Sequence, residues 1–248
     1  MFFNKSDDTK DKVIDKVLSN DSFTNLNIDL IDLDLKIETG DKFEVHYKGL
    51  SDEEPSVELT NDTIEIKEPK IDHKDSKLWK KGIFEVNIVS YNDGGNLIIT
   101  VPEDIHLSAG RVSTISGDTD IKNLKLDSLS LFVVSGDVSL KETQVDEVKL
   151  TATSGDIDFK RVKVKQGKVK LTSGDFTMKN GEVSGKLQVS TSSGDNIVED
   201  VKAQQYQLST LSGDNSLFGK NGTVAKVNST NNDGTIILST LSGDNTVK

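Results

Sequence analysis

The chain has 248 residues, of which 33 % are hydrophobic, enough for one large β domain or two domains of ordinary size. A formal net charge of -11 argues against a general nucleic-acid-binding protein, because such proteins cluster Lys and Arg to reach phosphate groups. The chain contains no cysteine, which excludes disulfides, thiolate catalysis and cysteine-based zinc sites.

Residues 1–21 are rich in charge and have no apolar core of the kind that a signal peptide requires. Val13, Ile14, Val17 and Leu18 recur at helical spacing, so we expect either a charged tail or a short helix here. The sequence has no apolar run of about 18 residues, and we expect no membrane-spanning segment. These patterns favour a soluble protein of the cytoplasm, with association with the cell envelope as the alternative.

Residues 22–110 show the alternation of apolar and polar side chains that is typical of β-strands, as in Leu26, Ile28 and Leu30. No linker rich in Pro, Gly or Ser separates this region from the rest of the chain. We therefore expect irregular strands that cap the N-terminal end of the repeats that follow and share their core.

Two segments of this region are candidates for ligand recognition. One contains Trp79, Lys80 and Lys81, and the other is the turn that begins at Tyr91. A basic and aromatic cluster can bind a glycan, an anionic lipid or a single-stranded nucleic acid. The alternative is that Trp79 fills the end of the domain while the lysines are solvated. For an acidic chain, we expect a protein or a glycan as the partner and not a nucleic acid.

In residues 111–248 the tripeptide Ser-Gly-Asp recurs at a nearly constant interval. The tripeptide begins at Ser116, Ser135, Ser154, Ser173, Ser193, Ser212 and Ser242. The first six copies therefore lie 19, 19, 19, 20 and 19 residues apart, and Asn231, Asn232 and Asp233 fill the next position in the same register. A fixed period of this kind is typical of repeat proteins in which each repeat is one structural unit.

Each repeat has the residue pattern of short strands. Apolar and polar residues alternate directly after the tripeptide, as around Val138 and Leu140, and again later, as around Leu129 and Leu131. Two or three short strands per repeat would stack their inward side chains on those of the next repeat. We therefore expect an all-β fold, a single-stranded parallel β-solenoid of about 19 residues per turn, right-handed as crossovers between parallel strands usually are.

The tripeptide itself has a structural interpretation. Its Gly is expected at a corner with positive φ, and its Asp is expected to accept a backbone N–H just beyond the turn. The alternative is a calcium site, because the carboxylates would stack at the spacing of the turns. Carboxylates about 4.8 Å apart repel by only about 0.9 kcal/mol in water, which an exposed row tolerates without metal. The glycine-rich calcium nonapeptide pattern is also absent.

The C-terminal end departs from the regular pattern. Residues 208–215 and 238–245 are identical octapeptides, and the chain stops at Lys248, a few residues into its last repeat. An uncovered last turn would present unpaired backbone groups. We therefore expect either that this edge forms a homo-oligomer or that the chain folds back to cap it.

The sequence contains no recognisable catalytic set. His46, His73 and His106 lack the spacing of metal ligands, and no nucleophile elbow, phosphate loop or dinucleotide fingerprint occurs. Asp156 and Asp175 would resemble a glycosidase pair, but the same Asp returns in every repeat and therefore marks the repeat. The sequence predicts no enzyme, no cofactor and no metal.

The chain resembles a bacterial family of unknown function whose members are called putative adhesins or adhesin-head-like domains. The resemblance is carried by a strand at 27–30, a hairpin at 35–41, a strand at 97–102 and the Ser-Gly-Asp ladder, and covers about residues 22–248. It implies a β-solenoid, no catalytic residues, and links to the bacterial envelope and its stress responses. The missing signal peptide and anchor depart from the pattern of a surface protein.

These observations favour a non-enzymatic binding or scaffold protein, either adhesin-like or linked to cell-envelope stress. One alternative is a structural protein that self-assembles through an open C-terminal turn. A carbohydrate-active enzyme built on a β-helix is the third hypothesis.

Overall fold

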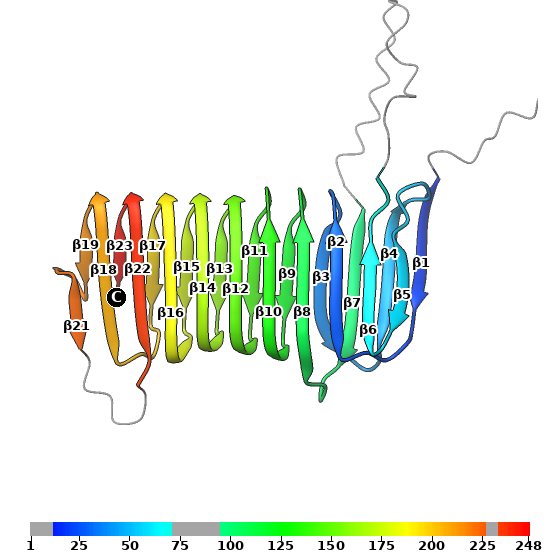
Figure 1. Cartoon of the computed structure of the whole chain (residues 1–248), viewed down its shortest axis with the longest axis horizontal. Coiled ribbons are helices and arrows are strands. Elements are labelled where there is room, and N and C mark those ends of the chain that lie inside the picture. The colour runs from blue at the N-terminus through cyan, green and yellow to red at the C-terminus, as the bar shows by residue number, and fades with distance from the viewer. Residues whose placement is uncertain (1–11, 71–94, 227–232) are drawn as a thin grey trace, which may run out of the picture.

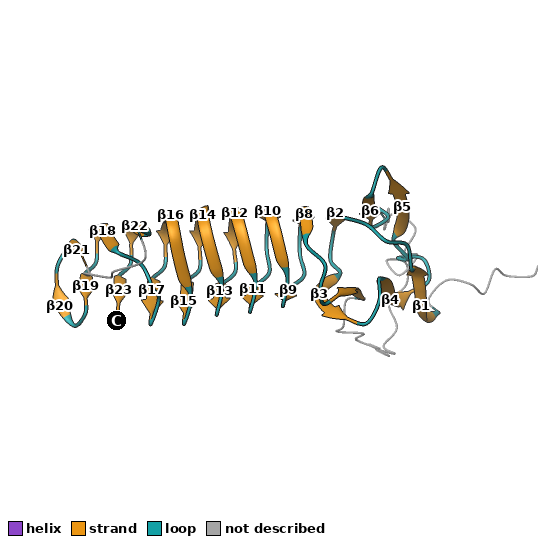
Figure 2. Ribbon diagram, turned by 90° about the horizontal axis from the view of Figure 1, so that it is seen from below, coloured by secondary structure: helices purple, strands orange, loops and turns teal. Residues whose placement is uncertain are grey.

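The computed structural model of the protein describes residues 12–70, 95–226 and 233–248 (Figure 1). Every regular element in these ranges is a β-strand. The strands form one sheet of 12 and one of 11, and the two sheets face each other along an elongated molecule (Figures 1 and 2). Most neighbouring strands are parallel, so the all-β prediction is confirmed for the described residues, and the architecture is solenoid-like.

The strands follow one another along the whole chain. They are β1 (Val13–Ser19), β2 (Asn25–Leu30), β3 (Asp34–Gly40), β4 (Glu44–Leu50), β5 (Ser56–Thr60), β6 (Thr63–Lys67), β7 (Asn96–Pro102), β8 (Leu107–Thr114), β9 (Thr119–Lys122), β10 (Lys125–Val133), β11 (Val138–Lys141), β12 (Gln144–Ser154), β13 (Ile157–Lys160), β14 (Lys163–Ser173), β15 (Phe176–Lys179), β16 (Glu182–Ser193), β17 (Asn196–Glu199), β18 (Gln205–Ser212), β19 (Asn215–Leu217), β20 (Lys220–Asn221), β21 (Val224–Lys226), β22 (Thr235–Ser242) and β23 (Asn245–Val247).

Each Ser-Gly-Asp repeat contributes one strand to each sheet. A short strand, such as β11, pairs in parallel with β9 and β13 in the 12-stranded sheet, which we call the short-strand sheet. A longer strand, such as β12, pairs with β10 and β14 in the 11-stranded sheet, which we call the long-strand sheet. The two later apolar segments of a repeat lie on one strand, since main-chain pairing continues through the polar residues between them.

Two corners connect the strands of a repeat. At the first corner the Gly of the tripeptide has positive φ, as predicted, for example +108° at Gly155. A Cβ there would also lie 2.1 Å from the carbonyl oxygen of Gly136 in the turn below, so glycine is required both by conformation and by space. The second corner places residues such as Asn123, Glu142 and Arg161 at φ between 52° and 60°.

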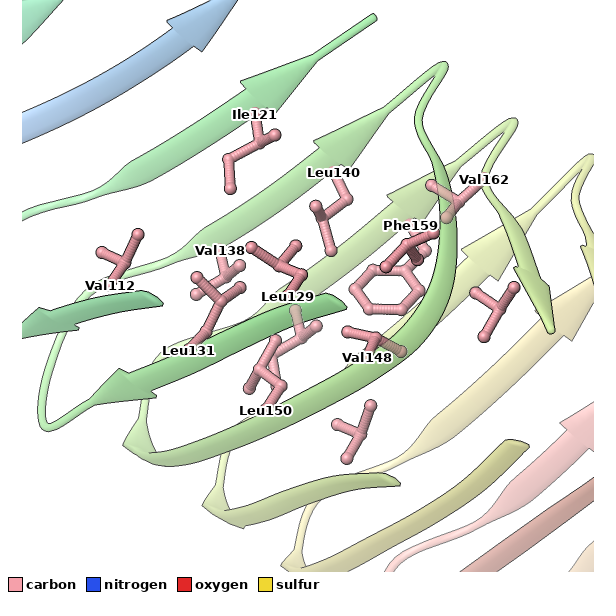
Figure 3. Packing of buried hydrophobic residues seen from close by; sticks show 14 of the residues in the cluster. Val112, Ile121, Leu129, Leu131, Val138, Leu140, Val148, Leu150, Phe159 and Val162 are labelled. Carbon is pink, nitrogen blue, oxygen red and sulfur yellow. The ribbon is translucent and has the colours of Figure 1, made fainter. Parts of the chain in front are cut away.

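The core lies between the two sheets and runs the length of the molecule. Ile121, Leu140 and Phe159 point inward from successive short strands, facing Leu131 and Leu150 from the long strands (Figure 3). All five side chains are at most 2 % exposed. Each therefore stacks on its counterpart one turn away, and the apolar contacts join neighbouring turns as well as the two sheets.

The N-terminal region extends both sheets, but its first element is not a helix. Residues 1–11 lie outside the described part, and Val13–Ser19 forms strand β1, which pairs antiparallel with β4. Val13 and Val17 are 48 % and 41 % exposed, so the helically spaced apolar residues do not share a buried face. The prediction of a short helix was therefore wrong for these residues, because the open edge of β4 supplies main-chain partners that a single helical turn would not.

The C-terminal end also differs from the prediction. Strands β22 and β23 do not form the outermost turn, since they lie between the turn of β16 and β17 and the turn of β18 and β19 (Figure 1). The prediction of an open last turn at the C-terminus was wrong: the last residues in the sequence are internal in space. The outermost turn carries the small antiparallel strands β20 and β21 instead. Asn231 and Asn232 lie outside the described residues.

The described residues include no helix that is long and apolar enough to cross a membrane.

Candidate binding face

The Asp residues of the tripeptides form a continuous ladder along one corner of the molecule. The Oδ1 atom of Asp118 accepts the backbone N–H of Asp137 at 2.8 Å, and Asp156 does the same for Asp175 at 2.8 Å. The acceptor therefore serves the next turn rather than its own, and the ladder begins at Asp34, before the first tripeptide. This use is structural: it satisfies one exposed donor per turn.

Metal binding has no further support on this corner. Within the described ranges, no group of three or more His, Cys, Asp or Glu side chains could hold a metal ion. His46 and His106 each lie 2.6 Å from a carboxylate oxygen, of Asp15 and Asp127 respectively. His73 lies outside the described residues.

Four candidate residues named from the sequence, Trp79, Lys80, Lys81 and Tyr91, also lie outside the described residues. Their proposed role in ligand recognition therefore stays a prediction. In the described part of the repeats, residues 111–226 and 233–248, charged side chains lie on the outward face of the long-strand sheet.

Four lysines gather on the outward face of the long-strand sheet. Lys149 lies on β12 directly beside Lys168 of β14, and Lys170 of β14 and Lys186 of β16 extend the group. Lys149 and Lys168 are in register on neighbouring strands, which lie about 4.8 Å apart, so these two like charges repel each other when no anion is present. None of the four forms an ion pair with another described residue; on β14 it is Lys165 that does so, with Asp146 at 3.7 Å. We call these four residues the lysine cluster.

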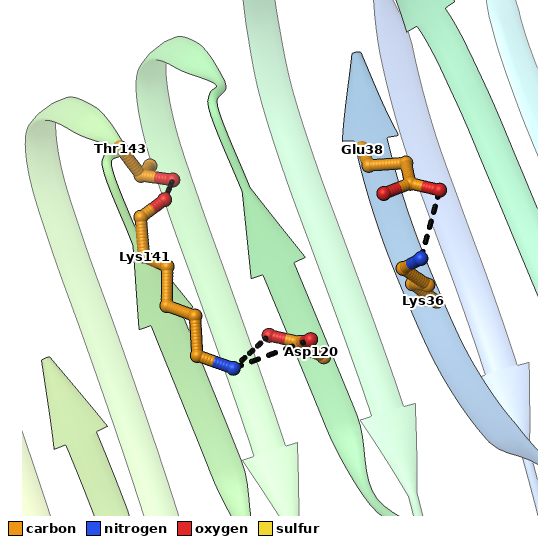
Figure 4. A network of polar contacts seen from close by, with 5 residues as sticks. All are labelled: Lys36, Glu38, Asp120, Lys141 and Thr143. Atoms are coloured by element: carbon orange, nitrogen blue, oxygen red, sulfur yellow. Dashed lines mark hydrogen bonds and ion pairs between the residues drawn. The ribbon is translucent and has the colours of Figure 1, made fainter. Parts of the chain in front are cut away.

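Lysines on the opposite face of the molecule are arranged differently. On the short-strand sheet, Lys141 Nζ lies 3.2 Å from Asp120, and Lys36 Nζ lies 2.9 Å from Glu38 (Figure 4). Lys179 likewise lies 3.3 Å from Glu199. These three lysines are therefore paired within the protein, whereas Lys122 and Lys160 of the same sheet form no ion pair with a described residue. The lysine cluster likewise has no ion pair with a described residue, and its nearest carboxylate on the same face is that of Glu147.

A hollow adjoins the lysine cluster on the same face. Its volume is about 610 Å³, and Lys170 belongs to its lining. Much of its lining is apolar, and hydroxyl groups are contributed by residues that include Thr151, Thr172, Ser190, Ser192, Ser209 and Ser239. Leu211 and Leu241 lie at one end and are 83 % and 58 % exposed. We call this feature the hydroxyl hollow.

Part of this hollow is formed by β22, which lies between β16 and β18 in the long-strand sheet. Strands β18 and β22 pair in register, so that Leu211 and Leu241 are neighbours although they lie far apart in the sequence. Sequence reasoning missed both the lysine cluster and the hydroxyl hollow. The alternation within each strand predicts which side chains point outward, but the order of the turns was needed to see which outward residues share a surface.

A partly buried carboxylate, that of Glu68, takes the place of the tripeptide at the N-terminal end. Glu68 accepts the backbone N–H of Ile31 at 2.7 Å and that of Leu33 at 3.3 Å, and so holds the corner that precedes β3. Burial, followed by the neighbouring Asp32, raises the pKa of Glu68 to about 7. Glu68 thus stabilises a turn and does not face the lysine cluster.

Two stacked, mostly parallel sheets joined by repeated glycine corners define an all-β protein of the solenoid-like class. The chain belongs to the Toastrack DUF4097 family, whose model matches residues 23–248. No curated protein matches the sequence. The match covers nearly the same residues as the family resemblance inferred from the sequence, and it supports membership of a family of unknown function.

Solved structures are similar to this chain at low sequence identity. A putative adhesin from Bacteroides fragilis is 14 % identical with a TM-score of 0.50, over 96 % of this chain and 97 % of that one. A putative cell adhesion protein from Clostridium sporogenes is 14 % identical with a TM-score of 0.41, over 96 % of this chain and 99 % of that one. A putative lipid binding protein from Parabacteroides distasonis is 12 % identical with a TM-score of 0.39, over 95 % and 97 %.

Proposed function

We propose that the protein is a non-enzymatic binding module whose long-strand sheet binds an extended anionic glycan. The observation that carries the proposal is the lysine cluster, in which Lys149, Lys168, Lys170 and Lys186 lie together with no ion-pair partner among the described residues. Adhesion is the role named for the Bacteroides fragilis protein, and we extend a role of this kind to the present chain as part of the proposal.

The chemistry of the face suits such a ligand. The lysine cluster would attract carboxylate or phosphate groups, and the overall charge of -11 would repel anions from the rest of the surface. The hydroxyl groups of the hydroxyl hollow can donate to and accept from sugar hydroxyls. Because the lysine cluster spans the three neighbouring strands β12, β14 and β16 and the hydroxyl hollow continues beyond it, the face is extended, which favours a polymer over a compact ligand.

The test compares polygalacturonate, an anionic glycan, with dextran, a neutral one, in biolayer interferometry at low and high salt. We expect binding of polygalacturonate only, and weaker binding at high salt because exposed charges are screened. The double variant Lys168→Ala/Lys170→Ala should weaken binding by up to about tenfold, the effect of removing two exposed charge contacts.

A matched control variant has the same change in net charge on the other sheet. Lys141→Ala/Lys179→Ala removes two lysines that already have carboxylate partners, and it should change the dissociation constant by less than about twofold. The proposal would be overturned if the wild-type protein bound neither glycan. Equal losses in the two double variants would overturn the assignment to this face.

A further inference from the structure

The C-terminal turn, formed by β22 and β23, lies between two turns that are consecutive in the sequence. We call them the Ser193 turn, formed by β16 and β17, and the Ser212 turn, formed by β18 and β19. In Figure 1 the C-terminal turn is drawn in red between the yellow and orange strands. The chain therefore passes the position next to the Ser193 turn, builds the Ser212 turn beyond it, and later returns to fill the position it left. We call this position the slot.

The C-terminal turn satisfies polar groups on both sides of the slot. Asn196 of the Ser193 turn donates its side-chain N–H to Asn245 at 2.8 Å, and Asn245 donates in turn to Asn215 of the Ser212 turn at 2.8 Å. The Asp ladder also continues across the slot: Asp244 donates its backbone N–H to Asp195, and its carboxylate accepts the backbone N–H of Asp214. Asn196 and Asn245 are fully buried, so an empty slot would leave buried donors and acceptors without partners.

The contacts in the slot are not unique to the C-terminal residues. Residues 208–215 and 238–245 have the same sequence and pair in the same register, as in Leu208 beside Leu238 and Ser212 beside Ser242. Each of the two octapeptides could therefore make the contacts that the other makes. Within these eight residues the side-chain chemistry does not distinguish the two segments, so the covalent connection contributes to the choice of occupant.

During folding, the chain's own C-terminal segment and that of a second copy can compete for the slot. The slot stays open until residues 235–248 arrive, and its two edges can be satisfied equally well by the same residues of another copy. Tethering favours the chain's own segment by raising its effective concentration, commonly to the millimolar range. At high protein concentration the segment of a second copy competes, because exchange of an identical element creates no unfavourable contact.

We propose that residues 235–248 exchange between two copies of this chain, so that the C-terminal turn of each copy fills the slot of the other. The product is a dimer joined through the two slots. It differs from stacking of open edges, since the exchanged strands lie inside each sheet and not at its end.

A disulfide can report which chain fills the slot, because the protein has no native cysteine. Ser190 Oγ of β16 and Ser239 Oγ of β22 lie 3.0 Å apart, so Ser190→Cys/Ser239→Cys would place two thiols together across the slot. The variant is refolded under reducing conditions at several protein concentrations, oxidised, and resolved by non-reducing electrophoresis. We expect a disulfide-linked dimer whose fraction rises with the protein concentration during refolding.

The control pair crosses two turns that never exchange. Lys170→Cys/Ser190→Cys joins β14 to β16, which are neighbours within one chain in either arrangement, and it should give only monomers with an internal disulfide. An internal disulfide in Ser190→Cys/Ser239→Cys at every concentration would overturn the proposal. So would a dimer that forms equally in both variants.

A second measurement covers the case in which the cysteine variant does not fold. Wild-type protein refolded at low and at high concentration is analysed by size-exclusion chromatography with light scattering. We expect a dimer after refolding at high concentration that persists on dilution, because the exchanged strands must unfold locally to separate. Monomers under all refolding conditions would contradict exchange.

Discussion

At the scale of single residues, the corner of each repeat combines a glycine that no other residue can replace with an aspartate that serves the next turn. Gly155 has φ of +108° and lies against the backbone of Gly136, so both the conformation and the contact exclude a side chain. Asp156 is exposed and contributes one hydrogen bond, to the backbone N–H of Asp175. The two residues of one motif should therefore differ greatly in their tolerance to substitution.

The contribution of the Asp ladder can be measured at Asp156. We expect Asp156→Ala to lower the free energy of unfolding by about 0.5–1.5 kcal/mol, the usual net value of one hydrogen bond. Asp156→Asn keeps the Oδ1 acceptor and removes one like charge from the ladder, so it should leave stability within about 0.5 kcal/mol of wild type. Urea unfolding of both variants is the measurement. A loss as large in the Asn variant as in the Ala variant would mean that the charge itself matters.

Glu68 should make stability depend on pH. Its pKa is raised from 4.5 to about 7 in the folded protein, so the folded state binds a proton that the unfolded state has released between these pH values. Stability therefore falls as the pH rises through this window. Glu68 is only partly buried, which limits the effect to roughly 1–2 kcal/mol.

The measurement is the melting temperature of wild type and Glu68→Gln from pH 4 to pH 8, taken as a difference at each pH. Titrating groups that do not contact Glu68 contribute equally to both proteins and cancel in this difference. We expect wild type to lose stability relative to Glu68→Gln as the pH rises through the window. Parallel pH profiles would show that the carboxyl of Glu68 does not titrate there.

At the scale of strands, the hydrogen-bonded side-chain amides of Asn196, Asn245 and Asn215 indicate which turns can be neighbours. The position that holds Val138, Ile157 and Phe176 in earlier repeats holds Asn196, and then Asn215 and Asn245, at the C-terminal end. A buried Asn beside an apolar residue would lose its partner, whereas a second Asn satisfies it. The three Asn-bearing strands therefore lie together, and in the structure β23 is the central one, between β17 and β19.

Asn245 is the central member of this ladder. Asn245→Val should remove the acceptor of Asn196 and the donor to Asn215, and lower the free energy of unfolding by about 1–3 kcal/mol. The control is Thr246→Ala on the same strand, which is only partly buried and should cost less than about 0.5 kcal/mol. Thermal unfolding followed by circular dichroism compares the two. Equal effects would mean that the amide ladder adds no specific stability.

At the scale of the whole molecule, lysines lie on both outer faces, and the faces differ in what surrounds them. On the short-strand sheet Lys36 and Lys141 have carboxylate partners. On the long-strand sheet the lysine cluster lies beside the hydroxyl hollow and has no ion-pair partner among the described residues. On a chain of net charge -11, the proposed function requires that anions reach this cluster.

Much of the fold could be predicted from local pattern. The tripeptide period and the alternation around Val138 and Leu140 predicted stacked parallel strands, because side-chain direction alternates along any strand. Positive φ at the tripeptide glycine was also predictable, since no other residue adopts it as readily. The left-handed residues of the second corner were not, because Glu142 and Arg161 adopt that conformation only under the pairing of the turns around them. Handedness stays a prediction.

The sequence by itself determined that the chain is a stack of β-strand repeats with a continuous core, because the period and the alternation of polarity are local properties that each repeat carries. Only the tertiary structure decided the order of the turns at the C-terminal end, the strand at Val13–Ser19, and the surface that joins Leu211 to Leu241. These features depend on which backbone edge is open and which buried amide lacks a partner. Each feature depends on alternative strand pairings between segments far apart in the sequence, and the residues of a single strand do not show which pairing is preferred.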